Sequence, residues 1–184
     1  MAQQTPQTYQ LKITLNGAKP PIWRRVKVSG ATDLFELHDI IQIAMGWEDS
    51  HLHQFVAGGK RYGIVDDEYD TGMIDEEGVR IDALLKKEEE SIDYEYDFGD
   101  GWGHKVMLEK ITPAIPGDVL PTCIGGSRAC PLEDVGGVWG YEEFLKAYSD
   151  KDHPEHEDRL EWAGEDFDPE YFDPDEVNEI LSGA

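Results

Sequence analysis

The sequence has few basic residues, and this shortage excludes one large class of function. Its 184 residues include 16 Lys and Arg against 40 Asp and Glu, which gives a formal net charge of −24 at pH 7. Nucleic-acid binding requires clustered Lys and Arg that displace counterions from phosphates. The tightest basic cluster holds only Lys19, Arg24, Arg25 and Lys27. We therefore expect no direct nucleic-acid binding.

Long apolar runs, export signals and cysteines are also scarce. No stretch approaches the roughly 18 uninterrupted apolar residues that a membrane-spanning helix needs. The first ten residues, MAQQTPQTYQ, have neither the basic region nor the apolar region that directs secretion. We therefore expect a cytoplasmic protein without a membrane partner, in which the two cysteines stay reduced and packed.

The acidic charge is concentrated in two segments. Residues 66–100 hold 15 acidic and three basic side chains, and residues 150–176 hold 13 acidic and two basic ones. A solvated acidic surface that keeps the protein soluble is the simpler interpretation of this density. Docking of a basic partner on one acidic segment is the alternative.

The apolar residues that are present predict an α+β fold. They make up 39% of the sequence, enough for a core in a chain of this length. Residues 9–16 alternate between apolar and polar positions, as a half-buried strand does, and a second strand is expected at 22–29. Arg24 falls on the apolar face of that second strand. We expect it to reach water at a sheet end, and pairing with a buried carboxylate is the alternative.

The segment that follows these two strands predicts a helix. Asp33 and Glu36 resemble a capping box, apolar residues then recur at helical spacing, and Gly46 ends the helix. Further elements are expected as a hairpin at 51–65, a weak helix at 81–87, and helices at 141–148 and 174–181. We predict one α+β domain over residues 8–181: a mainly antiparallel, roll-like sheet whose hairpins pack against helices, with an acidic C-terminal helical extension. Residues 1–7 are expected to be disordered.

Residues 91–111 predict a β-hairpin with reactive side chains near its tip. A three-residue loop at 99–101, with Gly101 in the left-handed conformation, keeps the aromatic side chains of both strands on one face. This register pairs Phe98 with Trp102 and Tyr96 with His104. The imidazole is therefore expected beside Tyr96, close to the tip.

Residues 121–141, PTCIGGSRACPLEDVGGVWGY, predict a fixed loop because glycine and proline are frequent in it. The loop is interpreted equally well as the wall of a small site and as a plug that packs Trp139 and Tyr141 into the core. The hairpin tip and this loop supply our candidate ligand-binding residues: Tyr96, Asp97, Asp100, Trp102, His104, Arg128, Glu133 and Asp134.

Patterns for metal binding and for known catalytic motifs are weak. The segment Asp67–Gly78 resembles a calcium loop but has glycine where the bidentate Glu should stand. A zinc site would draw on Cys123, Cys130, His51, His53 and His104, although the cysteines are too far apart for a zinc knuckle. No GxSxG elbow, Walker loop, HExxH motif or dinucleotide fingerprint is present. We predict no metal and no cofactor, with the zinc set as the alternative.

Several motifs in order carry a family resemblance: PPIWRR at 20–25, LHDIIQIAMGW at 37–47, HLHQF at 51–55, YDFGDGWGHKVMLE at 96–109, CIGGSRACPLEDVGG at 123–137 and FDPEYFD near the end. Together they resemble the plasmid pRiA4b ORF-3-like family. The resemblance implies a compact α+β domain and implies little about activity. Some members carry a transposon-resolvase label, which implies an accessory role for a mobile element. A serine recombinase needs a nucleophilic Ser among clustered arginines, and only Ser127 stands beside an arginine here.

These observations favour a non-catalytic binding or adaptor domain whose sheet end receives a protein or small-molecule ligand. The alternative is a small enzyme that uses His104 as acid or base, oriented by Asp97, Asp100 or Glu133. A polar, water-filled cleft around His104 would favour catalysis, and dry aromatic packing would favour a structural role.

Overall fold

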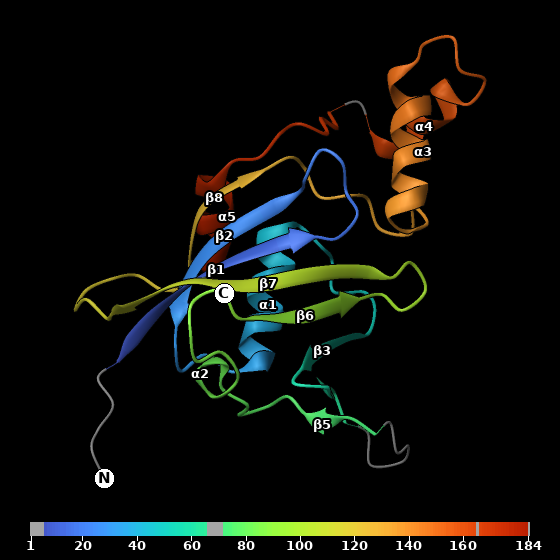
Figure 1. Ribbon diagram of the computed structural model, residues 1–184. Coiled ribbons are helices and arrows are strands. Elements are labelled where there is room, and N and C mark those ends of the chain that lie inside the picture. The colour runs from blue at the N-terminus through green and yellow to red at the C-terminus, as the bar shows by residue number, and fades with distance from the viewer. Residues whose placement is uncertain (1–5, 66–71, 165, 184) are drawn as a thin grey trace.

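Eight strands form one open sheet in the computed structural model, which describes residues 6–65, 72–164 and 166–183 (Figure 1). The strands are β1 (Gln7–Leu15), β2 (Trp23–Ser29), β3 (His53–Ala57), β4 (Lys60–Gly63), β5 (Ile74–Asp75), β6 (Ser91–Tyr96), β7 (Trp102–Pro113) and β8 (Thr122–Ser127). Their order across the sheet is β5-β4-β3-β6-β7-β1-β2-β8. Neighbouring strands are antiparallel except for the parallel pair β4 and β5.

The helices are α1 (Leu34–Met45), α2 (Ile81–Leu84), α3 (Gly137–Ser149), α4 (His156–Ala163) and α5 (Pro174–Leu181). Figure 1 shows α1 behind the sheet, α5 near β8, and α3 beside α4 at the upper end of the molecule. The predicted α+β fold, with a mainly antiparallel sheet and C-terminal helices, is confirmed. None of the helices in the described ranges combines the length and apolar character that crossing a membrane requires.

The core lies between the sheet and α1, as the alternation of β1 predicts. The apolar side chains of β1 are buried, with Leu11 and Ile13 fully inaccessible to solvent. Helix α1 begins with the predicted capping box: the Asp33 side chain accepts from the Glu36 N–H while the Glu36 side chain accepts from the Asp33 N–H. Gly46 ends the helix at φ 101°, a left-handed conformation that suits glycine.

The β6–β7 hairpin has the predicted faces but a different register. Tyr96 pairs with Trp102 rather than with His104, so the prediction is wrong by two residues. A shift of two keeps every side chain on its expected face, whereas a shift of one would reverse them. Strand β6 ends at Tyr96 because Asp97 adopts φ 53° and its N–H donates to the Leu52 carbonyl at 2.9 Å. The loop therefore spans 97–101 instead of 99–101.

Arg24 is fully buried, so both of our expectations for it were wrong. Its guanidinium donates to backbone carbonyls at the end of α1, to Ala44 at 2.7 Å and to Met45 at 3.3 Å. It also lies 4.0 Å from the centroid of the Phe172 ring. Carbonyls and an aromatic face satisfy the cation where we expected water or a carboxylate. The Arg24 side chain therefore links β2 to the C-terminal end of α1.

Three further expectations need correction. Residues 1–5 lie outside the described residues, but Gln7 already belongs to β1, so the expected disorder does not extend to residue 7. A helix that we did not predict, α4, lies between the helices predicted at 141–148 and 174–181. In α4, His156 is buried and its Nδ1 lies 3.0 Å from the Ala147 carbonyl oxygen. The 121–141 segment is not a single loop, because it contains β8 and the start of α3. Within it Tyr141 packs into the core as a plug residue would, whereas Trp139 is exposed.

Candidate functional site

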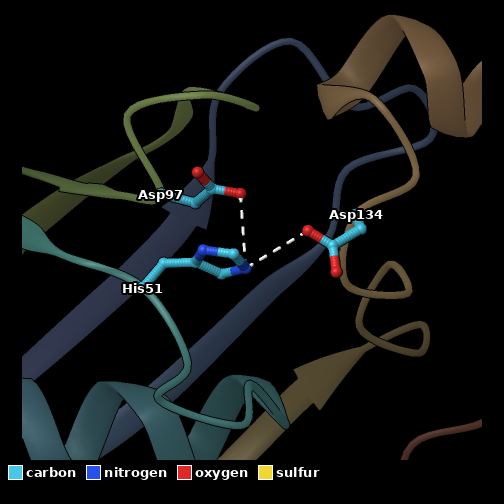
Figure 2. A group of neighbouring side chains, drawn as sticks. All are labelled: His51, Asp97 and Asp134. Carbon is cyan, nitrogen blue, oxygen red and sulfur yellow. Dashed lines mark ion pairs between the residues drawn. The ribbon is translucent and has the colours of Figure 1, made fainter.

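Three segments that are distant in the sequence meet at one end of the sheet. They are the turn between α1 and β3, the tip of the β6–β7 hairpin, and the loop that leads from β8 to α3. The first contributes His51, the second Asp97, and the third Glu133 and Asp134. Figure 2 shows the His51 ring between Asp97 and Asp134, with its Nε2 directed toward both carboxylates.

The His51 Nε2 atom is surrounded by three carboxylate oxygens. It lies 3.3 Å from Asp134 Oδ1, 3.6 Å from Glu133 Oε2 and 3.7 Å from Asp97 Oδ2. These distances are longer than those of ordinary N–H···O hydrogen bonds, which run from about 2.7 to 3.2 Å. Within the described ranges, Nε2 is buried and makes no hydrogen bond. The imidazole is therefore close to three negative groups without being bonded to any of them.

Glu133 is held by one of its two oxygens. Its Oε1 accepts from the Tyr96 hydroxyl at 3.0 Å and from the Glu48 backbone N–H at 2.9 Å. The hydroxyl itself accepts from the Ser50 N–H at 2.9 Å, and burial raises the pKa of Tyr96, so it remains a donor. Oε2 is buried and, among the described residues, has no hydrogen-bond partner. The fixed Oε1 thus leaves Oε2 directed at His51.

Asp97 is fixed in a similar way. Its Oδ1 accepts from the Gly99 N–H at 2.9 Å, a bond that closes the hairpin tip. Its Oδ2 faces His51 (Figure 2), and the side chain is 10% exposed. The positive φ of Asp97 turns the chain out of β6 at this residue and places the carboxylate beside the imidazole.

Asp134 forms the open side of the site. Its side chain is 75% exposed, in contrast to the side chains of Asp97 and Glu133. In the part of the chain that the structure describes, the His51 imidazole is the only side chain paired with these three carboxylates in an ion-pair geometry, and no Lys or Arg is. The site therefore has an excess of negative charge that no Lys or Arg neutralises, and one face through which a ligand can enter.

The structure thus brings together four of the predicted ligand-binding residues: Tyr96, Asp97, Glu133 and Asp134. Asp100 lies beside them and joins the hairpin tip to the loop. Arg128 lies elsewhere: it pairs with Glu170 at 2.8 Å and donates to the Pro20 carbonyl. From the sequence we considered His51 only as one of five possible zinc ligands. The HLHQF motif supplied that histidine, but nothing in the sequence showed which acidic side chains would surround it.

Trp102 and His104 belong to the core and not to the site. Both are fully inaccessible to solvent. The His104 ring lies 5.5 Å from that of Tyr94 and 6.2 Å from that of Trp47. Burial outweighs the nearby backbone carbonyls of Trp102 and Tyr94 and lowers the pKa of His104 to about 4. This dry aromatic packing is the arrangement that we expected of a structural histidine, because a catalytic acid or base must reach its substrate.

The five residues of the predicted zinc set do not converge. Cys123 and Cys130 are free thiols whose pKa values burial raises. His53 pairs with Glu76 at 2.9 Å and stacks on His38 with ring centroids 3.5 Å apart. Among the described residues, the one group of three possible ligands whose atoms lie within 4.8 Å of one another is that of Figure 2, which contains no cysteine. The rejected calcium loop at 67–78 lies partly outside the described residues.

Comparison with known proteins gives three likenesses. A family model described as plasmid pRiA4b ORF-3-like protein matches residues 7–176. The uncharacterized protein y4hQ of Sinorhizobium fredii is 41% identical over 156 residues, which cover 84% of this chain and 80% of that protein. A crystal structure of a protein of unknown function from Methanosarcina mazei Go1 is 41% identical, with a TM-score of 0.86 over 95% of this chain and 99% of that chain.

Proposed function

The chain belongs to the plasmid pRiA4b ORF-3-like family, and from that premise we propose that it is a non-catalytic binding domain that takes a small cationic ligand at the sheet end. The observation that carries the proposal is the convergence of Asp97, Glu133 and Asp134 on His51, with no Lys or Arg paired to them in the described ranges. Carboxylates gathered in a partly enclosed site create a negative potential that attracts positive charge.

The fixed geometry of the site favours binding over catalysis. Two of the three carboxylates are held before any ligand arrives. Glu133 accepts from the Tyr96 hydroxyl and from a backbone N–H, and Asp97 accepts from the Gly99 N–H. A preorganised site loses less conformational entropy on binding and so gains affinity. The one histidine that the sequence suggested as an acid or base, His104, lies in the core and out of reach of a ligand.

The net charge of the protein also limits the class of ligand that can bind. A formal charge of −24 repels polyanions, so a nucleic acid is a poor ligand for this surface. A small cation fits both the local charge of the site and the single exposed face at Asp134.

Isothermal titration calorimetry tests the proposal. The full-length protein is titrated with a panel of cations that includes Zn²⁺, Mn²⁺, Mg²⁺, agmatine and spermidine. We expect at least one to bind with a dissociation constant below 1 mM and to bind at least tenfold more weakly to Asp97→Asn. The matched control is Asp93→Asn, which removes the same charge from the exposed face of the same hairpin and should change the affinity by less than twofold. Binding that is absent, or equal in both variants, would contradict the proposal.

A further inference from the structure

We propose, resting on the proposed function, that the cation is a divalent transition metal ion of the Zn²⁺ class, coordinated by His51 Nε2, Asp97 Oδ2 and Asp134 Oδ1, with the Glu133 carboxylate beside them. The set has one imidazole nitrogen and two carboxylate oxygens. Each donor atom comes from a segment that the fold already fixes, so the ligands are assembled by the tertiary structure rather than by a local sequence motif.

The spacing of the donor atoms fits a coordination sphere. Zinc lies about 2.0–2.1 Å from imidazole nitrogen and about 2.0–2.2 Å from carboxylate oxygen, and in a tetrahedron such bonds place neighbouring ligand atoms about 3.4 Å apart. His51 Nε2 lies 3.3 Å from Asp134 Oδ1 and 3.7 Å from Asp97 Oδ2, and the three ligand atoms all lie within 4.8 Å of one another. The two nitrogen–oxygen distances are longer than ordinary hydrogen bonds and close to the edges of this tetrahedron.

One ligand atom and one neighbouring oxygen have no other partner within the described ranges. His51 Nε2 and Glu133 Oε2 are both buried and both lack a hydrogen bond. A buried polar atom without a partner costs about 1–3 kcal/mol, and in native proteins such atoms are uncommon. A metal ion bound to His51 Nε2 would satisfy that atom and place positive charge beside Glu133 Oε2. Asp97 adds a side chain that is nine-tenths buried and aimed at the same point (Figure 2).

The remaining oxygen atoms are oriented as those of metal ligands commonly are. The second oxygen of Glu133 is bonded to Tyr96 and to the Glu48 N–H, and the second oxygen of Asp97 is bonded to the Gly99 N–H. Hydrogen bonds of this kind from surrounding groups fix ligating carboxylates, and their loss lowers metal affinity by about 10- to 100-fold.

The donor set also selects among metals. Imidazole is a good ligand for Zn²⁺ and other transition metals, whereas Mg²⁺ and Ca²⁺ prefer oxygen donors alone. For mixed nitrogen and oxygen sites the affinity for Zn²⁺ exceeds that for Mn²⁺. We therefore expect Zn²⁺ to bind at least 100-fold more tightly than Mg²⁺ and more tightly than Mn²⁺.

The experiment uses chelator-treated full-length protein titrated with ZnCl₂, in competition with a chromogenic zinc indicator. We expect one ion per chain with a dissociation constant of 1 µM or tighter, at least a 100-fold loss in His51→Gln, and a similar loss in Asp97→Asn. The control is His153→Gln, which changes a histidine outside the site and should leave zinc affinity within twofold. Far-UV circular dichroism and the melting temperature of the metal-free variants show whether each one folds.

The outcomes separate the inference from the proposed function. Zinc binding that survives in folded His51→Gln would overturn the assignment of these ligands. Binding of agmatine or spermidine that depends on Asp97, without zinc binding, would overturn the metal and leave the cationic ligand in place. Failure of every cation to bind would reject both. Loss of zinc in His51→Gln and Asp97→Asn, with retention in His153→Gln, would establish the site.

Discussion

Asp100, at the tip of the β6–β7 hairpin, accepts a hydrogen bond through Oδ2 from the backbone N–H of Gly136 at 2.9 Å. The bond joins the hairpin to the loop that carries Glu133 and Asp134. The next residue, Gly137, packs so closely on the hairpin that a Cβ atom there would lie 2.4 Å from the Asp100 carbonyl oxygen. The distance between Asp97 and the two loop carboxylates therefore depends on this backbone contact.

Gly137→Ala is expected to separate the hairpin from the loop. Gly137 has φ 69°, so alanine adds backbone strain to the clash with Asp100. We expect a loss of about 2–4 kcal/mol in the free energy of unfolding and at least a tenfold loss of cation affinity. Urea unfolding and calorimetry measure the two effects.

Gly58→Ala is the matched control for Gly137→Ala. Gly58 has a similar φ of 57°, but a Cβ there would meet no atom within 4 Å. It should cost only about 1–2 kcal/mol from backbone strain and leave cation affinity unchanged. Equal affinity losses in both variants would show that the contact at Asp100 does not set the geometry of the site.

Tyr96→Phe is expected to weaken cation binding without unfolding the protein. The ring remains to fill the core, but the hydroxyl that links the Ser50 N–H to Glu133 Oε1 is lost. We expect a stability loss of about 1–2 kcal/mol and a 10- to 100-fold lower affinity for zinc. The control is Tyr62→Phe, a buried tyrosine on β4, which lies two strands away from β6 in the sheet. Unchanged affinity in Tyr96→Phe would mean that the orientation of Glu133 does not matter.

His104 makes stability depend on pH. The pKa of His104 in the folded protein, about 4, lies below the ordinary histidine value of 6.5, so the unfolded chain binds more protons between these values. Its stabilisation is therefore fully present above pH 6.5 and is lost as the pH falls toward 4. From pH 7 to pH 5 the loss is about 2 kcal/mol. Burial, together with the charge of His53, also lowers the pKa of His38, which adds to the loss in the same direction.

Urea unfolding at pH 7 and pH 5 measures this dependence. His104→Leu should show a drop in unfolding free energy smaller by about 2 kcal/mol than that of the unmodified protein. His153→Gln, at a histidine outside the core, should keep the original drop. An unchanged drop in His104→Leu would mean that the buried imidazole does not titrate as its surroundings indicate.

Arg24→Lys is expected to be among the more damaging conservative changes in the chain. The guanidinium bonds the carbonyls of Ala44, Met45 and Ser127 at once and lies over Phe172. A lysine ammonium cannot reproduce this planar fork. We expect a loss of about 2–4 kcal/mol in unfolding free energy, measured by urea unfolding.

Arg61→Lys provides the comparison for Arg24→Lys. Arg61 is exposed and its Nε donates to the Gln54 side chain. Its replacement should change stability by less than about 0.5 kcal/mol. Similar losses at the two positions would contradict the role assigned to the buried guanidinium.

Much of the fold could be read from local patterns. The alternation of residues 9–16, the capping box at Asp33 and the helix at 174–181 each depend on neighbouring residues, and each agrees with the structure. The register of the β6–β7 hairpin does not depend on neighbours alone. Its loop is longer than the glycines suggest because the Asp97 N–H donates to the carbonyl of Leu52, which lies in the connection between α1 and β3.

Residue types and their spacing were enough to predict most helices and strands, the aromatic face of the hairpin and the family. The choice of the carboxylates that surround His51, among 40 acidic residues, became visible only in the folded chain. Residue 51 meets Asp97 and Asp134 through contacts that span dozens of residues, and such contacts leave no periodic trace. Local alternation placed Arg24 and His104 on the apolar faces of their strands, but only the packing of distant segments shows that both side chains are buried.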